Sequence, residues 1–200
     1  MSCGLDVIRR KHQLAWPRVI IGTALFGTAC NPRNSMDGPG VQEYCVRALR
    51  AELLAVTGDV ETVCFPFCEN EHWFSICVSF TSRQIQIADS LNRQPPEGLV
   101  ERIKDVFTDT LKRDIRTWSN RLVRLPCPQQ SDGSSCGVVV LSFIEKICAD
   151  TQQVDWSANT ADAQRQRWLS GCIDLVTTRA RARERMGTPL VTQSSMVRYL

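Results

Sequence analysis

Histidine, long apolar runs and an excess of charge are all scarce in this sequence of 200 residues. There are only two histidines, and the formal net charge is +3 at pH 7. So small a charge gives no reason to expect a nucleic-acid partner. No apolar run approaches the roughly 20 residues that a membrane-spanning helix needs, so we expect a protein that does not enter the membrane.

The chain also lacks internal repeats, low-complexity tracts and the apolar core of a secretory signal peptide near its N-terminus. We therefore expect an intracellular protein, in the nucleus or the cytoplasm. The length suits one domain of ordinary size, which can bury a core without a disulfide or a structural metal. We expect a monomer without a cofactor.

Cysteine is plentiful, but its ten positions do not cluster as they do in a small disulfide scaffold. We therefore expect reduced thiols. Several of them lie in apolar runs, such as Cys77 in FSICVSF and Cys148 in FIEKIC, where a free cysteine acts as a small buried hydrophobe. Cys136 stands in a different setting, between a polar loop and an apolar segment.

Periodicity divides the chain into helices and strands. A helical pattern covers 41–56, after a loop over 30–40, and the period then changes to two in TVCFPF, HWFSICVSF and RQIQIADS. The Thr81-Ser82-Arg83 corner makes the last two runs a hairpin. Antiparallel pairing in this hairpin brings His72, at the start of one strand, close to Asp89, at the end of the other.

Further along, the pattern predicts a helix over 99–115, a short strand over 121–125, the polar loop CPQQSDGSS and a buried helix that starts near Cys136. A last helix is predicted over 162–179, and the basic stretch over 179–185 is interpreted as a solvated helix end rather than a binding patch. We expect its inner face to carry Trp168, Leu169, Cys172, Ile173 and Val176. Trp118, Trp156 and Trp168 are interpreted as packing residues.

Cys136 has the setting that a nucleophilic thiol needs. A thiol reacts as its thiolate, and a helix N-terminus with a histidine nearby lowers the thiol pKa. His72 is the candidate base because the only other histidine, His12, lies in a polar N-terminal stretch that we expect to be mobile. Asp89 can orient His72 across the hairpin. Gln130, on the same loop as Cys136, can donate to an oxyanion together with the Cys136 backbone amide.

These residues also carry a family resemblance. His72-Trp73, then Asp89-Ser90, then Pro128-Gln129-Gln130-Ser131-Asp132-Gly133-Ser134-Ser135-Cys136-Gly137 resembles the ubiquitin-like-protein-specific proteases, that is, the SUMO or sentrin-specific protease family. The likeness covers about 60–178. It implies an α+β, papain-like (adenain-type) cysteine-protease fold, with a central mixed or antiparallel sheet flanked by helices and the nucleophile at the N-terminus of a buried helix.

The resemblance also implies an activity and a partner. The activity is hydrolysis after the Gly-Gly tail of a SUMO-like modifier, for precursor maturation or for deconjugation, and Trp73 would cover a tunnel that admits only glycines. The chain then divides into a divergent or incomplete N-terminal part (1–59), a catalytic core (60–178) and a basic C-terminal tail (179–200). An effector of this kind would be delivered into a host cell.

The sequence departs from the family pattern in two places, one in the loop before Cys136 and one in the N-terminal segment that contributes to modifier binding. Position 135 is Ser where the family often has Asp, and no Trp-Leu-x-Asp segment precedes the core. Alternative functions are a deubiquitinase or an effector-type acetyltransferase on the same residues, or a non-catalytic modifier-binding module. Trp73 favours the peptidase over acetyl transfer.

A metal site is the remaining alternative. Cys64, Cys68, His72 and Cys77 form the spacing C-x3-C-x3-H-x4-C, close to a zinc knuckle. Such knuckles sit in short glycine-containing loops, whereas these residues alternate with large apolar side chains in predicted strands. The pattern therefore favours a sheet over a metal centre.

Overall fold

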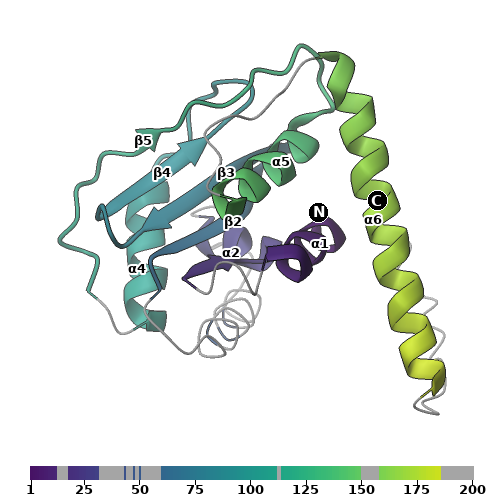
Figure 1. The fold of residues 1–200 in the computed structure, drawn as a ribbon. Helices are drawn as coiled ribbons and strands as arrows, with labels where there is room; N and C mark the ends of the chain where they lie inside the picture. Colours follow the sequence, from purple (N-terminus) through teal and green to yellow (C-terminus); the bar gives the residue numbers. More distant parts are fainter. Residues whose placement is uncertain are drawn as a thin grey trace.

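The computed structural model describes residues 1–12, 18–31, 43, 47, 50, 60–111, 114–149 and 158–185 (Figure 1). Apart from residues 43, 47 and 50, the helix predicted over 41–56 lies outside these residues, as do Trp156 and most of the loop predicted over 30–40. The elements are α1 (Ser2–His12), β1 (Val19–Ile21), α2 (Ala24–Cys30), β2 (Thr62–Glu69), β3 (His72–Ser79), β4 (Gln84–Ala88), α4 (Leu99–Leu111), β5 (Val123–Arg124), α5 (Cys136–Ala149) and α6 (Ala158–Arg185).

The strands form one mixed sheet in the order β1-β2-β3-β4-β5. The three central strands pair antiparallel, whereas β1 and β5 run parallel to their neighbours at the two edges. The predicted α+β class with a mixed sheet and flanking helices is confirmed. The predicted hairpin is confirmed as β3 and β4, with Ser75 opposite Ala88, so that Asp89 follows the last paired residue.

A tight turn fixes where β3 begins. Asn70 and Glu71 both have positive φ, 48° and 60°, and Glu69 pairs directly with His72. Two consecutive residues with positive φ are typical of a type I′ turn, whose twist matches that of a hairpin. The turn therefore makes His72 the first residue of β3.

Helices cover both faces of the sheet. On one face, α2 and α4 bury an aromatic core in which the Phe26 ring lies 5.5 Å from Phe65 and 6.2 Å from Phe107. Gly27 lets α2 approach β2, because a Cβ at this position would lie 2.4 Å from the Pro66 carbonyl oxygen. On the other face lie α5 and α1, and the long α6 packs outside them (Figure 1).

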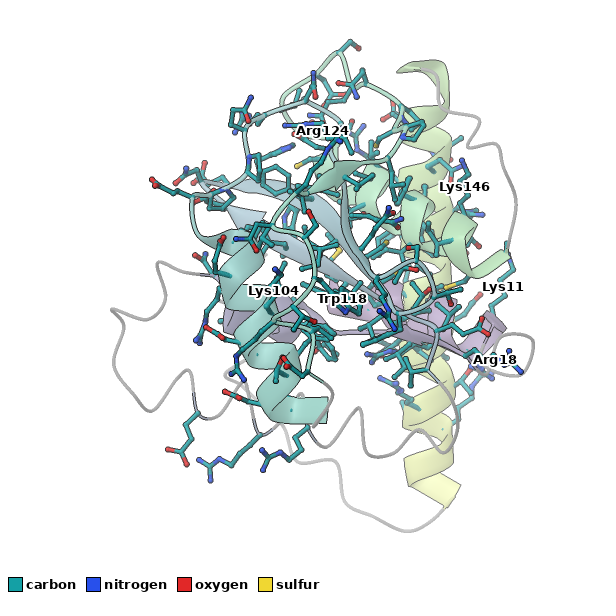
Figure 2. All side chains as sticks on the ribbon, turned by 90° about the vertical axis from the view of Figure 1, so that its left-hand side faces the viewer. Lys11, Arg18, Lys104, Trp118, Arg124 and Lys146 are labelled. Carbon is teal, nitrogen blue, oxygen red and sulfur yellow. The ribbon has the colours of Figure 1, made fainter. Side chains whose placement is uncertain are left out.

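The loop after α4 is anchored by a buried lysine (Figure 2). The Lys104 ammonium donates to Asn120 Oδ1 at 2.5 Å and to the carbonyl oxygens of Arg116 and Trp118. The Trp118 ring meets Phe80 edge-on at 5.6 Å, as expected for a packing residue. This loop leads into β5.

The first twelve residues are more ordered than the sequence predicted. The stretch that ends at His12 was expected to be mobile, but it forms α1, and the side chains of Leu5 and Ile8 are fully buried against α5 and α6. Ile8 is three positions after Leu5, so both lie on one face of the helix. The expectation of a mobile segment was therefore wrong.

The prediction for the last helix was right about its existence and about the burial of Trp168, but most of the predicted inner face was wrong. Helix α6 is longer than expected and includes 179–185. Its buried residues are Ala161, Trp168 and Leu175, seven positions apart. Leu169, Ile173 and Val176 are instead 57–62% exposed.

Helix α4 is shorter than predicted, because it ends at Leu111, although Ile115 is buried in the core. Among the described residues, no helix is long and apolar enough to cross a membrane.

Candidate active site

His72 and Asp89 form a buried pair at one end of the sheet. His72 Nε2 lies 2.6 Å from Asp89 Oδ1, and the two residues are only 2% and 5% exposed. The Asp89 carboxylate also accepts from the backbone amides of Leu91, at 2.9 Å, and Arg93. With Nε2 turned to the carboxylate, the other ring nitrogen, Nδ1, points away from Asp89. This is the arrangement of a histidine base held by an acid.

Cys136 is the first residue of α5, as predicted. Ser135 caps the helix, because its carbonyl oxygen accepts from the amides of Val138 and Val139, both at 3.0 Å. The N-terminus of α5 lies against the start of β3, since a Cβ at Gly137 would be 3.7 Å from Cδ1 of Trp73. Cys136 directly precedes Gly137, and His72 directly precedes Trp73, so this approach brings the two candidate residues to the same end of the sheet.

Gln130 lies in the loop before Cys136 and is 8% exposed. Its Oε1 accepts from the Ser90 hydroxyl at 2.5 Å, and its Nε2 donates to the Asp132 carbonyl oxygen at 2.5 Å. Its backbone amide donates to the Ser90 carbonyl oxygen at 2.9 Å. The predicted oxyanion donor therefore sits beside the residue that follows Asp89, which joins the two parts of the site.

Asp132 organises the turn between Gln130 and Cys136. Its Oδ1 accepts from the amides of Ser134 and Ser135, both at 2.7 Å, and its Oδ2 accepts from the Ser135 hydroxyl at 2.5 Å. The Ser135 hydroxyl, followed by the Ser134 amide, lowers the pKa of Asp132 to about 2. Residue 135 is Ser where the family often has Asp. In this chain the Asp132 carboxylate, three residues earlier, contacts Ser135.

An arginine from α6 closes this network. Arg165 Nη2 donates to the hydroxyls of Ser135 and Ser134 at 2.6 and 3.2 Å, and Nη1 donates to Asp162 at 2.6 Å. Its side chain is 37% exposed. Asp132, Arg165 and Ser90 were assigned no role by the sequence analysis. The Asp-x-Ser-Ser spacing is a signal for a turn around Asp132, whereas nothing in the sequence links Arg165 to a loop about thirty residues earlier.

Three other thiols are poor nucleophiles. Burial raises the pKa of Cys30, Cys127 and Cys148 to about 12, so they remain protonated at neutral pH. The nine cysteines among the described residues are free.

The four residues of the zinc alternative do not converge. The Cys64 and Cys77 sulfurs lie 3.0 Å apart in the core, whereas His72 is turned to Asp89. In the part of the chain that the structure describes, no group of three or more His, Cys, Asp or Glu residues is arranged to hold a metal ion.

The sequence of residues 27–175 matches the model of the Ulp1 protease family, C-terminal catalytic domain. The chain belongs to the Ulp1 protease family. It is therefore a cysteine peptidase of the SUMO or sentrin-specific protease family, with the fold expected from the resemblance.

Solved structures support the Ulp1-like fold. The C-terminal Ulp1 protease domain in complex with Smt3, the yeast ortholog of SUMO, is 19% identical with a TM-score of 0.61, over 86% of this chain and 75% of that one. The Ulp1-like SUMO protease catalytic domain from Chaetomium thermophilum is 20% identical with a TM-score of 0.59, over 86% and 66%. The Xanthomonas campestris effector XopD bound to ubiquitin is 18% identical with a TM-score of 0.51, over 83% and 89%. No curated protein sequence matches the chain.

Proposed function

We propose that this Ulp1-family peptidase hydrolyses the bond after the C-terminal Gly-Gly of a SUMO-like modifier, either to release the modifier from a substrate lysine or to trim a precursor. The observation that carries the proposal is the buried 2.6 Å contact between His72 and Asp89 beside the N-terminus of the Cys136 helix. The structural similarity to a protease domain in complex with Smt3 supports the choice of modifier.

In the proposed first half-reaction, His72 takes the Cys136 proton and the thiolate attacks the carbonyl carbon of the last glycine. The carbonyl π electrons move to the oxygen, where Gln130 Nε2 and the Cys136 amide stabilise the negative charge. As the intermediate collapses, the C–N bond breaks and His72 donates its proton to the leaving amine. The products are a free amine and a thioester between the modifier and Cys136.

In the second half-reaction, His72 removes a proton from a water molecule that attacks the thioester carbonyl. The C–S bond breaks, Cys136 leaves as thiolate and the modifier departs with a free C-terminal carboxylate. Asp89 keeps its contact with Nε2 throughout, which stabilises the imidazolium that forms in both halves.

Trp73 is the proposed specificity residue. It is half-buried, and it directly follows the base. The indole lies close to the start of α5, because a Cβ at Gly137 would be in van der Waals contact with its Cδ1, at 3.7 Å. An indole in this position would exclude side chains at the last two residues before the scissile bond, so glycines alone would pass.

Ubiquitin is the second candidate modifier, because a structure with the same fold, XopD, is bound to ubiquitin. Ubiquitin-like modifiers with a Gly-Gly tail would satisfy the same narrow passage. The choice between them depends on contacts with the folded body of the modifier.

A covalent labelling panel tests the proposal. The protein is incubated with SUMO, ubiquitin and a Nedd-type modifier, each carrying a C-terminal electrophile, and adducts are detected by mass spectrometry. We expect SUMO to label fastest, at Cys136. Fastest labelling by ubiquitin would favour the deubiquitinase, and labelling by none would reject the peptidase mechanism proposed here.

The controls use single cysteine substitutions. Cys136→Ala should abolish labelling and turnover while the thermal unfolding transition is kept. Cys172→Ser, which changes a half-buried thiol on α6, should leave both unchanged. Labelling that persists in Cys136→Ala would reject Cys136 as the nucleophile.

A further inference from the structure

Ser90 joins the end of β4 to the loop that carries Gln130. Its side chain is almost completely buried, at 2% exposure, and its hydroxyl donates to Gln130 Oε1 at 2.5 Å. Its carbonyl oxygen accepts from the Gln130 backbone amide at 2.9 Å. Ser90 therefore contacts both the main chain and the side chain of the proposed oxyanion donor.

The hydroxyl contact selects one orientation of the Gln130 amide. An amide has an acceptor oxygen and a nitrogen with two hydrogens. With Oε1 on the Ser90 hydroxyl, Nε2 donates one hydrogen to the Asp132 carbonyl oxygen at 2.5 Å, and the second hydrogen remains for an oxyanion. A flipped amide would place Oε1 opposite the Asp132 carbonyl, where two acceptors repel.

The two contacts differ in what they anchor. Asp132 lies two residues beyond Gln130 on the same exposed loop, so the two move together. Ser90 follows Asp89, whose carboxylate holds His72. Through Ser90, the Gln130 amide is therefore fixed relative to the base as well as to its own loop.

We infer that Ser90 is a positioning residue: its hydroxyl holds the Gln130 amide with Nε2 directed at the carbonyl oxygen that Cys136 attacks. This inference rests on the proposed function, in which Gln130 donates to the oxyanion. Ser90 itself does not contact the reacting atoms. The Asp89-Ser90 pair thus places the base with one residue and the oxyanion donor with the next.

Replacing the hydroxyl alone tests the inference. Ser90→Ala keeps the backbone contact with Gln130 and should lower kcat about tenfold, the net effect of one buried hydrogen bond, with KM unchanged. Ser90→Thr keeps a hydroxyl and should restore most of kcat. Ser75→Ala removes another buried serine hydroxyl, which contacts the Val140 carbonyl oxygen, and should leave kcat within about twofold of the wild type.

Two probes separate positioning from a general structural effect. The modifier that labels fastest in the panel is prepared with two C-terminal groups. A C-terminal aldehyde adds the Cys136 thiol and forms a hemithioacetal, whose oxygen lies where the oxyanion of the reaction develops. A C-terminal bromoethylamide alkylates the thiolate with loss of bromide and forms no such oxygen. Ser90→Ala should weaken aldehyde binding about tenfold and leave the alkylation rate unchanged. Equal effects on both probes, or no effect on either, would overturn the inference.

Gln130→Ala separates this inference from the proposed function. It should weaken the aldehyde adduct about 100-fold, again without slowing alkylation, and adding Ser90→Ala should then cost nothing more. If Gln130→Ala shows the difference between probes and Ser90→Ala does not, only the role of Ser90 is rejected. If Gln130→Ala shows no difference, the oxyanion role of Gln130 is rejected and the inference falls with it.

Discussion

The two halves of the candidate site are held by different kinds of structure. His72 and Asp89 are fixed by a tight turn, by the β3–β4 ladder and by backbone amides, and both are buried. The loop before Cys136 has four consecutive exposed residues, 131–134, and is held by side-chain hydrogen bonds around Asp132 and by Arg165 from a distant helix. The base half is thus set by the fold, whereas the nucleophile half depends on a few polar contacts that can be removed one at a time.

Asp89→Asn should have the largest effect on turnover, because it alters the base half of the site. An asparagine NH2 that faces Nε2 can pair only with the tautomer that carries its proton on Nδ1, and this tautomer cannot take the thiol proton. We expect kcat to fall about 10⁴-fold, as in the corresponding serine triad, with little change in KM, measured with a fluorogenic modifier amide.

The matched control for that measurement is Asp105→Asn, which changes an exposed aspartate paired with Arg116 at 3.0 Å. It should leave kcat within about twofold of the wild type, since surface pairs contribute little. A loss of less than tenfold for Asp89→Asn would remove Asp89 from the catalytic machinery and with it the contrast between the halves.

The base half is also the half that the sequence predicted well. Alternation of apolar residues predicted β3 and β4, and the pairing of two adjacent strands follows from their order, so the approach of Asp89 to His72 could be expected. The helix N-terminus at Cys136 was predicted because a polar loop changes abruptly to an apolar run. Both features are local, and local patterns are what a sequence displays directly.

The contacts that were missed join segments far apart in the chain. Arg165 reaches Ser135 over a separation of 30 residues, and Ser90 reaches Gln130 over 40. The inner face of α6 was predicted only in part for a related reason. Trp168 is buried as predicted, but Leu169, Ile173 and Val176 are exposed, because the packing of α6 on α1 and α5 buries the row of Ala161, Trp168 and Leu175. Periodicity identifies a helix without choosing its partner.

Arg165→Gln should have an intermediate effect on turnover, because it removes one of the contacts that hold the nucleophile half. The Ser134 and Ser135 hydroxyls lose their link to α6, while the contacts within the loop remain. We expect kcat to fall about fivefold, the order of one partly exposed charged hydrogen bond.

Arg167→Gln is the control on the same helix. Arg167 pairs with Glu145 and lies over the Trp168 ring, and its contacts are not with the loop. It should leave kcat within about twofold of the wild type, even if it lowers the melting temperature slightly. Equal losses of kcat in the two variants would show that α6 acts through general stability, and the nucleophile half would then need no specific support.

Asp132→Asn should have the smallest effect on turnover, about twofold, because Oδ1 keeps its contacts with the Ser134 and Ser135 amides and only the second acceptor is lost.

The effect of Asp132→Asn on stability should depend on pH. The pKa of Asp132 is lowered from 3.8 to about 2, so its stabilising contribution is full above pH 3.8 and is lost as the pH falls toward 2. The difference in melting temperature between wild type and Asp132→Asn should therefore be constant from about pH 7 to 5 and narrow below about pH 4. Carboxylates common to both proteins cancel in this difference. A difference that stayed constant, or widened, on acidification would mean that the Asp132 charge does not hold the loop, and that its carbonyl contact with Gln130 is the part of this residue that matters.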